Sequence, residues 1–296
     1  MFCEQVRPYL DKYLEGADRG RIGRLLRYSL LGGKGIRGYL VKHIIETLLP
    51  GQAAPWECVA AVELIHAASL VVDDLPCMDD DSVRRGKAAA HLAFGKHEAI
   101  LSSFYIVAES VRILFGALRK RAASGNATEE ALGQYNTLIT EWCDLLGRQL
   151  VVGQMLDLGS DAEEMLGFTC PGGDPIEKII QFKTCSLFSF AFALGSVFGG
   201  RSESLATFKE MGFHFGLMFQ LLDDLKDVGK DDPSVNYVLA RGWPASLKRY
   251  VEAREKLVTL LSKEGLYTPE FARLIAVLDS RFTGGRAAGA PAADGQ

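Results

Sequence analysis

Apolar residues recur at helical spacing along almost the whole chain, and few stretches alternate strictly between apolar and polar residues. This single pattern excludes most β-rich folds and favours an all-α protein. We expect one helix to end near residue 74 and place the others at about 4–15, 21–31, 36–49, 93–120, 128–158, 175–198, 204–228, 244–263 and 268–281. No internal repeat is evident in the sequence.

The breaks between these helices are too short to act as linkers between domains. They fall at Gly32-Gly33, Pro50-Gly51, Pro76, Ser124-Gly125-Asn126, Pro171-Gly172-Gly173 and Asp231-Asp232-Pro233. After Phe282 the chain is rich in glycine and alanine and has no periodic apolar face. We therefore expect one large helical domain over residues 1–282 and a disordered tail over residues 283–296.

Composition limits the partners and the compartment. Apolar residues make up 48% of the 296 residues, as in a globular protein with a sizeable core. A net charge of −4 argues against nucleic-acid binding. The six cysteines show neither CxxC spacing nor the density of a secreted scaffold, which favours reduced thiols. Because the N-terminus also lacks the apolar stretch of a signal peptide, we expect a cytoplasmic location.

One apolar segment raises the question of a membrane span. Residues 184–200, TCSLFSFAFALGSVFGG, carry no charge and are bounded by Lys183 and Arg201. The segment is rich in serine and glycine and falls short of the roughly 20 residues that a spanning helix needs. We expect a buried core helix and no transmembrane segment.

The segment Asp73–Gly86, DDLPCMDDDSVRRG, places aspartates at the end of a helix. Asp73 and Asp74 fall in the last helical turn, because Leu75 precedes Pro76 and is disfavoured in helical geometry. A helix C-terminus carries partial negative charge, so two carboxylates there favour a bound cation. A solvated acidic loop is the simpler alternative.

The helix before this segment carries a polar strip. At about 100° per residue, Glu63, His66, Asp73 and Asp74 share a face with Leu70 on an otherwise apolar helix. Such a strip is unusual in a core unless it lines a cavity.

A second acidic cluster lies within the sequence FQLLDDLKDVGKDD, residues 219–232. Gln220, Asp223, Asp224 and Asp227 are spaced i, i+3, i+4 and i+7, so they would share one arc of a helix. Two nearby lysines could relieve the repulsion, which is the purely structural alternative. Two carboxylate clusters without histidine or cysteine at zinc spacing favour Mg²⁺.

Three basic groups could bind an anionic substrate: GGKGIR (residues 32–37), Arg84-Arg85 and Lys183-Thr184. The first is a glycine turn before a predicted helix start, where free N–H groups suit a phosphate. It lacks the spacing of a Walker loop, so nucleotide triphosphate chemistry is not indicated. Each group alone is typical of a solvated surface, but together with two aspartate clusters they predict a pocket for diphosphates.

Five motifs in this order resemble those of the trans-isoprenyl diphosphate synthases, and they cover most of residues 30–230: GGKGIRG, ELIHAASLVVDDLPCMDDDSVRRG, GQMLD, KTCSLF and GLMFQLLDDLKD. Four residues separate Asp74 from Asp79, which is similar to bacterial farnesyl and plant-type geranylgeranyl diphosphate synthases. The resemblance implies a single helical bundle with both aspartate motifs facing a central cavity, usually as a homodimer. It also implies Mg²⁺-dependent, head-to-tail condensation of isopentenyl diphosphate with an allylic diphosphate.

The resemblance implies roles for the matching residues. The principal Mg²⁺ ligands would be Asp73, Asp79 and Asp223, supported by Asp74 and Asp227. Isopentenyl diphosphate would be held by Lys34, Arg37, His66 and Arg85. The allylic diphosphate would be held by Arg84, Lys183 and Gln220, and Thr184 would direct its oxygen dipole toward the nascent allylic cation.

The chain departs from the family pattern at four places. The family's usual GGKRxRP has glycines here at Gly35 and Gly38, and Ser103-Phe104 replaces a Gly-Asp pair. Lys226 stands at a position that is usually aliphatic or small. A lysine expected beyond the second aspartate motif has no clear counterpart, and Lys230 is the nearest substitute.

The expected product is inferred from the residues before the first aspartate motif. Ala68 and Ser69 stand where short-product members place an aromatic side chain, so we expect geranylgeranyl diphosphate, with farnesyl diphosphate as the alternative. Three other functions remain open. The chain could be a regulatory subunit of a heterodimeric synthase, a terpene cyclase, which has no need of an isopentenyl diphosphate site, or a purely structural helical protein.

Overall fold

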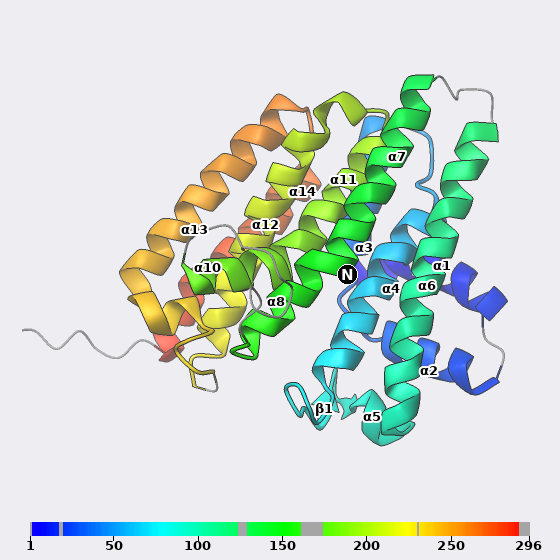
Figure 1. Cartoon of the computed structure of the whole chain (residues 1–296). Coiled ribbons are helices and arrows are strands. Elements are labelled where there is room, and N and C mark those ends of the chain that lie inside the picture. Colours follow the sequence, from blue (N-terminus) through cyan, green and yellow to red (C-terminus); the bar gives the residue numbers. More distant parts are fainter. Residues whose placement is uncertain (1, 18–19, 124–128, 161–173, 230, 290–296) are drawn as a thin grey trace, which may run out of the picture. The chain divides into compact units, whose positions relative to one another are not determined.

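The computed structural model describes residues 2–17, 20–123, 129–160, 174–229 and 231–289 (Figure 1). These residues are helical nearly throughout, which confirms the all-α prediction. The described chain falls into two compact units, and each is considered by itself. Unit 1 comprises residues 1–139 and 194–203, and unit 2 comprises residues 140–193 and 204–296. The expectation of a single domain stays a prediction.

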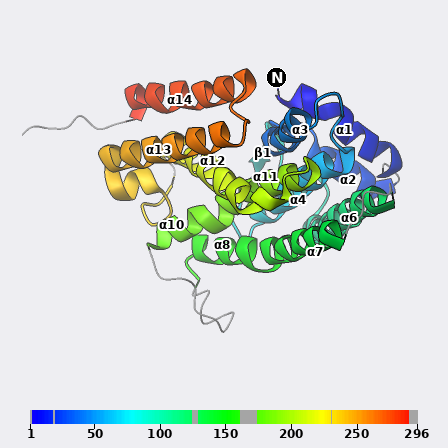
Figure 2. The same cartoon turned by 90° about the horizontal axis from the view of Figure 1, so that it is seen from above.

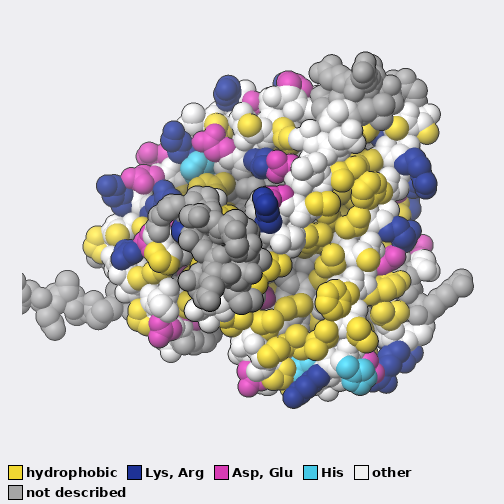
Figure 3. Space-filling view, in the orientation of Figure 1, with side chains coloured by type: hydrophobic (Ala, Val, Ile, Leu, Met, Phe, Trp, Pro, Cys, Tyr) yellow, Lys and Arg dark blue, Asp and Glu magenta, His cyan; other side chains and the backbone are white. Residues whose placement is uncertain are grey.

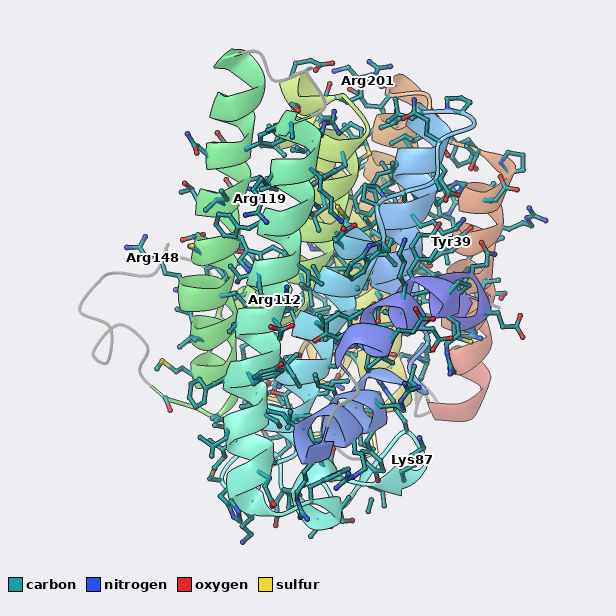
Figure 4. All side chains as sticks on the ribbon, turned by 90° about the vertical axis from the view of Figure 1, so that its right-hand side faces the viewer. Tyr39, Lys87, Arg112, Arg119, Arg148 and Arg201 are labelled. Carbon is teal, nitrogen blue, oxygen red and sulfur yellow. The ribbon has the colours of Figure 1, made fainter. Side chains whose placement is uncertain are left out.

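Unit 1 is built mainly from the N-terminal helices. They are α1 (Phe2–Ala17), α2 (Gly20–Leu30), α3 (Ile36–Leu48), α4 (Trp56–Asp73), α5 (Ala90–Ala93), α6 (Lys96–Arg121) and the first part of α7 (Glu129–Asp144). Helix α4 contacts α1, α2, α3 and α6. It lies alongside α6 in Figures 1 and 4. Because α4 is apolar on nearly all sides, it forms the core of this unit.

A short β-hairpin follows α4 and was not expected from the sequence. Strands β1 (Val83–Arg84) and β2 (Lys87–Ala88) pair antiparallel. Lys87, labelled in Figure 4, lies with its ammonium group 5.3 Å from the centre of the Tyr28 ring on α2. A two-residue strand is too short to produce a recognisable alternation, so periodicity gave no signal for it.

Unit 2 contains the remaining helices. They are the end of α7, the π-helical segment Leu145–Gln149, α8 (Leu150–Asp157), α10 (Pro175–Ile179), the π-helical segment Ile180–Cys185, the first part of α11 (Ser186–Phe198), α12 (Leu205–Lys226), α13 (Tyr237–Lys263) and α14 (Pro269–Gly289). A 3₁₀ turn, Ser202–Ser204, precedes α12.

Helix α12 forms the centre of unit 2 and contacts α13 and α14 (Figure 2). Phenylalanines fill the core, with the ring centres of Phe188 and Phe215 5.2 Å apart. Gly212 lets α12 approach α11 closely, because a Cβ there would lie 2.4 Å from the Cα of Ser189. These contacts fix α12 against α11, and the C-terminal end of α12 carries the second acidic cluster.

The helix boundaries differ from the predictions by more than three residues at two ends. Helix α13 begins at Tyr237, seven residues before the predicted start, and is kinked at Gly242, whose φ is 75°. Helix α14 extends to Gly289, so residues 283–289 are helical and the predicted disordered tail is wrong over that stretch. Residues 290–296 lie outside the described chain, as do the predicted breaks at 124–126 and 171–173.

Among the residues that the structure describes, two helical stretches are long and apolar enough to cross a membrane by length and composition alone. One is α6, and the other is the continuous helix Pro175–Phe198, which contains most of the uncharged segment 184–200. In the second stretch 72% of the most apolar window is buried within the protein, as a core helix requires. In α6 only 39% of the most apolar window is buried within the protein, so this helix carries exposed apolar side chains.

Candidate active site

The loop after α4 turns back on the end of that helix. The backbone N–H of Asp79 donates to the carbonyl oxygen of Asp73, with the two atoms 2.9 Å apart. Leu75 is buried in an apolar cluster with Val71, and Met78 packs against the same cluster. These contacts hold Asp73, which is partly exposed, beside Asp79, which is exposed. Both carboxylates can therefore be reached from solvent, as Mg²⁺ ligands must be.

Asp74 differs from Asp73 because its carboxylate is buried and paired with an arginine. It is 2% exposed, and its Oδ1 accepts a hydrogen bond of 2.7 Å from Nε of Arg84 on β1. Arg84 also donates to Oδ2 of Asp81 at 2.5 Å. Burial alone would lower the pKa of Arg84, but its bond to Asp74 and the nearby carboxylate charges raise it. Asp74 thus secures the hairpin to the end of α4, a role that the sequence did not reveal.

His66 lies within the basic group of unit 1. Its pKa is well below the usual value, because burial disfavours the imidazolium and because Arg37, Arg85, Arg84 and Lys34 are positively charged neighbours. The imidazole is therefore neutral near pH 7. Unit 1 brings together the four side chains that the resemblance assigns to isopentenyl diphosphate, although their contacts with it stay predictions.

Arg85 connects the hairpin to the glycine turn. Its Nη1 donates to the carbonyl oxygen of Ser29 at 2.8 Å, near the end of α2, where carbonyls lack partners within the helix. A Cβ on Gly33 would lie 2.7 Å from Cζ of Arg85. Gly33 is therefore needed for the guanidinium to lie against the turn.

The structure accounts for Gly35, where the family pattern has an arginine. Gly35 precedes α3 with φ of 66°, a left-handed conformation that other residues rarely adopt. A Cβ there would lie 3.3 Å from the Cα of Cys3 and 3.4 Å from Cβ of Val6, both on α1. A larger side chain would be strained and crowded by α1.

The second aspartate motif lies at the end of α12 in unit 2. Asp224 is 2% exposed, and its carboxylate accepts hydrogen bonds from Nε2 of Gln220 at 2.7 Å and from the backbone N–H of Tyr237 at 2.9 Å. Burial raises the pKa of Asp224 to about 6, and these two bonds oppose the shift. Asp223 stays partly exposed, and Asp227 comes directly after the last helical turn. The single arc predicted for the four residues is therefore divided between core and surface.

Lys226 lies next to the predicted metal ligand of this motif. Its Nζ donates to Oδ1 of Asp223 at 2.5 Å. An exposed pair of this kind adds little stability. Binding of Mg²⁺ to Asp223 would have to replace this ion pair. Lys226 therefore affects how readily the Asp223 carboxylate can bind a metal ion.

The helix Pro175–Phe198 presents Lys183 and Thr184 from its π-helical turn, a geometry that is often found at functional sites. Lys183 forms an ion pair with Asp157 at the end of α8, and Thr184 Oγ1 donates to Oε1 of Gln220 at 2.5 Å. Gly153 allows this arrangement, because a Cβ there would lie 2.5 Å from the backbone N of Lys183. The motif GQMLD suggested no role in the sequence, and the structure assigns its first and last residues to positioning Lys183.

The predicted Mg²⁺ ligands are divided between the two units. Asp73, Asp74 and Asp79 lie in unit 1, whereas Asp223 and Asp227 lie in unit 2. Within the described ranges, no three histidine, cysteine or acidic side chains are gathered closely enough to hold a metal ion. The chemistry of the donors fits Mg²⁺, because all are carboxylate oxygens and all except Asp74 are at least partly exposed.

The chain is similar to known proteins over most of its length. The polyprenyl synthetase family model matches residues 20–239. The chain is 34% identical over 229 residues to geranylgeranyl pyrophosphate synthase 12, chloroplastic, of Arabidopsis thaliana, covering 76% of this chain and 61% of the relative. It is 32% identical over 231 residues to the heterodimeric geranylgeranyl pyrophosphate synthase large subunit 1 of the same plant, covering 77% and 60%. The chain thus spans about three fifths of these relatives.

Among solved structures, the apo form of an FPP/GFPP synthase from Zymomonas mobilis superimposes with a TM-score of 0.72 and 26% identity, covering 96% of both chains. The isoprenoid-synthase fold expected from the sequence is confirmed by this likeness.

Proposed function

This chain belongs to the polyprenyl synthetase family, and we propose that it is a short-chain prenyltransferase that condenses isopentenyl diphosphate head to tail with an allylic diphosphate. The observation that carries the proposal is the basic group around His66 beside the carboxylates of Asp73 and Asp79. A helix end that gathers carboxylates and cations within one unit suits a diphosphate bound with Mg²⁺. The relatives named as geranylgeranyl pyrophosphate synthases support the same class.

Each group of residues has a task in this reaction. Mg²⁺ held by Asp73, Asp79 and Asp223, with Asp74 and Asp227 in support, would stabilise the negative charge that develops on the leaving diphosphate. Lys183, Arg84 and Gln220 would hold that diphosphate while its C–O bond breaks, and the bonding electron pair leaves with it. Thr184 would orient its oxygen toward the allylic cation, in the position that its bond to Gln220 maintains.

The second substrate must meet the cation before water does. Lys34, Arg37, His66 and Arg85 would hold isopentenyl diphosphate so that its double bond attacks the allylic carbon and forms the new C–C bond. Loss of a proton, accepted by the released diphosphate, then restores a double bond. Apolar helices such as α4 exclude water from the cation.

One experiment tests the activity. The purified protein is incubated with Mg²⁺, isopentenyl diphosphate and each of the C5, C10 and C15 allylic diphosphates, and the products are measured by chain length. We expect turnover that ends at geranylgeranyl diphosphate. Absence of turnover with all three substrates would contradict the proposal.

Two other functions predict different results in the same assay. A regulatory subunit, suggested by the relative named as a heterodimeric large subunit, would be inactive alone and would change the product of an added synthase. A terpene cyclase would release cyclic products without consuming isopentenyl diphosphate. We favour the synthase because the residues proposed to hold isopentenyl diphosphate lie together in unit 1.

Replacing Ala68 by phenylalanine is expected to shorten the product. Ala68 is buried on α4, five residues before Asp73, and the bulky ring would occupy space toward which a growing chain extends. The main product should change from C20 to C15 or C10, measured by chromatography of the dephosphorylated alcohols. An unchanged product distribution in a folded variant would refute the assignment of Ala68, and Ala117→Phe on α6 serves as a control for overpacking.

We also propose that α6 carries a homodimer interface. Apolar side chains gather on the face of α6 in Figure 3, and the exposed ones are Ile100, Leu101, Phe104, Tyr105 and Phe115. Phe104 is 70% exposed at a position where the family pattern has an aspartate. Exposed apolar patches of this kind mark interaction surfaces. Arg112 and Arg119 lie along the same helix in Figure 4.

Phe104→Asp should therefore dissociate the dimer, because it places a charge within the apolar patch. Sedimentation velocity should show a monomer for this variant. Val277→Asp on α14 is the control, because Val277 is also exposed but lies outside the patch. A monomeric wild-type protein would contradict the proposal, as would a Phe104→Asp variant that remains dimeric.

The cytoplasmic location expected from the sequence stays a prediction.

A further inference from the structure

Glu63 is a buried carboxylate in the middle of α4. It is 4% exposed and lies among apolar residues of the same helix. Burying a carboxylate is costly unless it is paired and hydrogen-bonded. Its Oε1 accepts a hydrogen bond of 2.7 Å from the backbone N–H of Gly38, which lies 25 residues earlier in the chain.

Gly38 belongs to the first turn of α3, where backbone N–H groups lack partners within the helix. Helix α3 begins after Gly35, which has no side chain to cap these groups. Glu63 therefore performs the capping from α4, and the positive end of the α3 dipole favours its negative charge. Burial raises the pKa of Glu63, while hydrogen bonds from Gly38 and Arg37 and the charges of Arg37 and Arg85 oppose that shift.

Gly38 is suited to this contact in two ways. The family pattern has proline at this position, and proline has no N–H to donate. A Cβ on Gly38 would lie 3.0 Å from Cγ and 3.2 Å from Oε1 of Glu63, and 3.1 Å from Cγ1 of Val59. The departure from proline thus supplies both the donor and the space for the acceptor.

The contact has a consequence for the glycine turn. The glycine turn that carries Lys34 leads directly into the first turn of α3, which carries Arg37, and Glu63 fixes that helical turn against α4. His66 lies three residues after Glu63 on α4, which is about one helical turn away. One helix therefore carries His66 and also holds the segment that carries the neighbouring cations.

We propose that Glu63 is a positioning residue that holds the first turn of α3 in the conformation in which Lys34 and Arg37 bind isopentenyl diphosphate. This inference rests on the proposed function and adds the group that orders its second-substrate site. The backbone N–H of Gly38 at the α3 N-terminus is then taken by Glu63, so the diphosphate is bound by the side chains of Lys34 and Arg37 and not by the backbone of the helix end.

The test compares three variants in steady-state kinetics. Glu63→Leu removes the acceptor and should raise KM for isopentenyl diphosphate at least tenfold, with KM for the allylic diphosphate within twofold of wild type. Glu63→Gln keeps an acceptor oxygen at the same position and should restore most of the affinity. Gly38→Pro removes the donor and should reproduce the Glu63→Leu effect, so the test stays decisive even if Glu63→Leu fails to fold.

Glu57→Leu is the matched control. Glu57 is also a buried glutamate of α4, 5% exposed, but its partner is Lys120 on α6 and not the glycine turn. This variant should lose stability to a similar extent, which thermal unfolding measures, but should leave both KM values unchanged. Equal changes in both KM values of Glu63→Leu, or a change in its melting temperature alone, would show that Glu63 is only structural.

The two proposals fail in distinguishable ways. Wild-type protein without turnover with any of the three allylic substrates would refute the proposed function. Active wild-type protein whose Glu63→Leu and Gly38→Pro variants keep the wild-type KM for isopentenyl diphosphate would refute the positioning role alone. Calorimetric titration of isopentenyl diphosphate into each variant provides the same comparison without turnover.

Discussion

Alanine at Asp73 or at Asp223 is expected to lower kcat by about 10²- to 10³-fold while the helical fold is kept, because each substitution would remove charge stabilisation that matters in the transition state. Both side chains reach the surface at the end of a helix. A carboxylate in the last turn of a helix opposes the helix dipole, so its removal should cost little stability. Steady-state kinetics at saturating Mg²⁺ and circular dichroism measure the two quantities.

Asp81 and Asp74 serve as comparisons for these variants. Asp81 is exposed in the same segment, and Asp81→Ala should change kcat by less than the Asp73 variant does. Asp74→Ala should instead lower the melting temperature, because it removes the buried partner of Arg84. Near-normal turnover in both the Asp73→Ala and Asp223→Ala variants would contradict the metal site and favour a purely structural protein.

Gly153→Ala is expected to be the most disruptive small substitution in unit 2. Its Cβ would lie 2.5 Å from the backbone N and 2.8 Å from the Cα of Lys183, so α8 and the π-helical turn would have to move apart. Overpacking of this kind costs about 1–3 kcal/mol. Displacement of Lys183 and Thr184 should also lower kcat/KM for the allylic substrate. Denaturant unfolding and kinetics of the same preparation measure both effects.

Gly147→Ala provides a control with the opposite expected effect on stability. Gly147 is exposed in the helical segment before α8, and a Cβ there would have no neighbour within 4 Å. Alanine should stabilise the helix by up to about 1 kcal/mol, because glycine is a poor helix former. If Gly153→Ala and Gly147→Ala changed stability in the same direction, close approach at Gly153 would not be the cause.

The sequence predicted the helices well because long amphipathic or apolar periods are strong signals. It missed features that depend on few residues or on distant partners. The β1–β2 hairpin has strands of only two residues, and the π-helical turns differ from α-helix by a single residue per turn. The early start of α13 depends on Asn236, whose side chain accepts a hydrogen bond from the backbone N–H of Leu239 as an N-cap.

For the site, motif order predicted which residues belong together but not what holds them. The cations near His66 were all predicted from the sequence. The partners of those residues were not, because Asp74 with Arg84 and Glu63 with Gly38 are contacts across 10 and 25 positions. No local propensity encodes such pairs. A role for Asp157 beside Lys183 could have been suspected from the sequence, because Asp157 closes the GQMLD motif four residues after Gly153.

The π-helical turn Ile180–Cys185 amounts to one residue inserted into the helix Pro175–Phe198. The wider π-helical turn absorbs this residue locally, so the α-helices on either side of it can keep their register. Phe188 lies beyond the turn, where its ring centre is 5.2 Å from that of Phe215 in the core. Deleting one residue from the turn should therefore displace Lys183 and Thr184 while the packing of Phe188 is largely kept. Loss of this residue in evolution would cost the chain its chemistry before it cost the chain its fold.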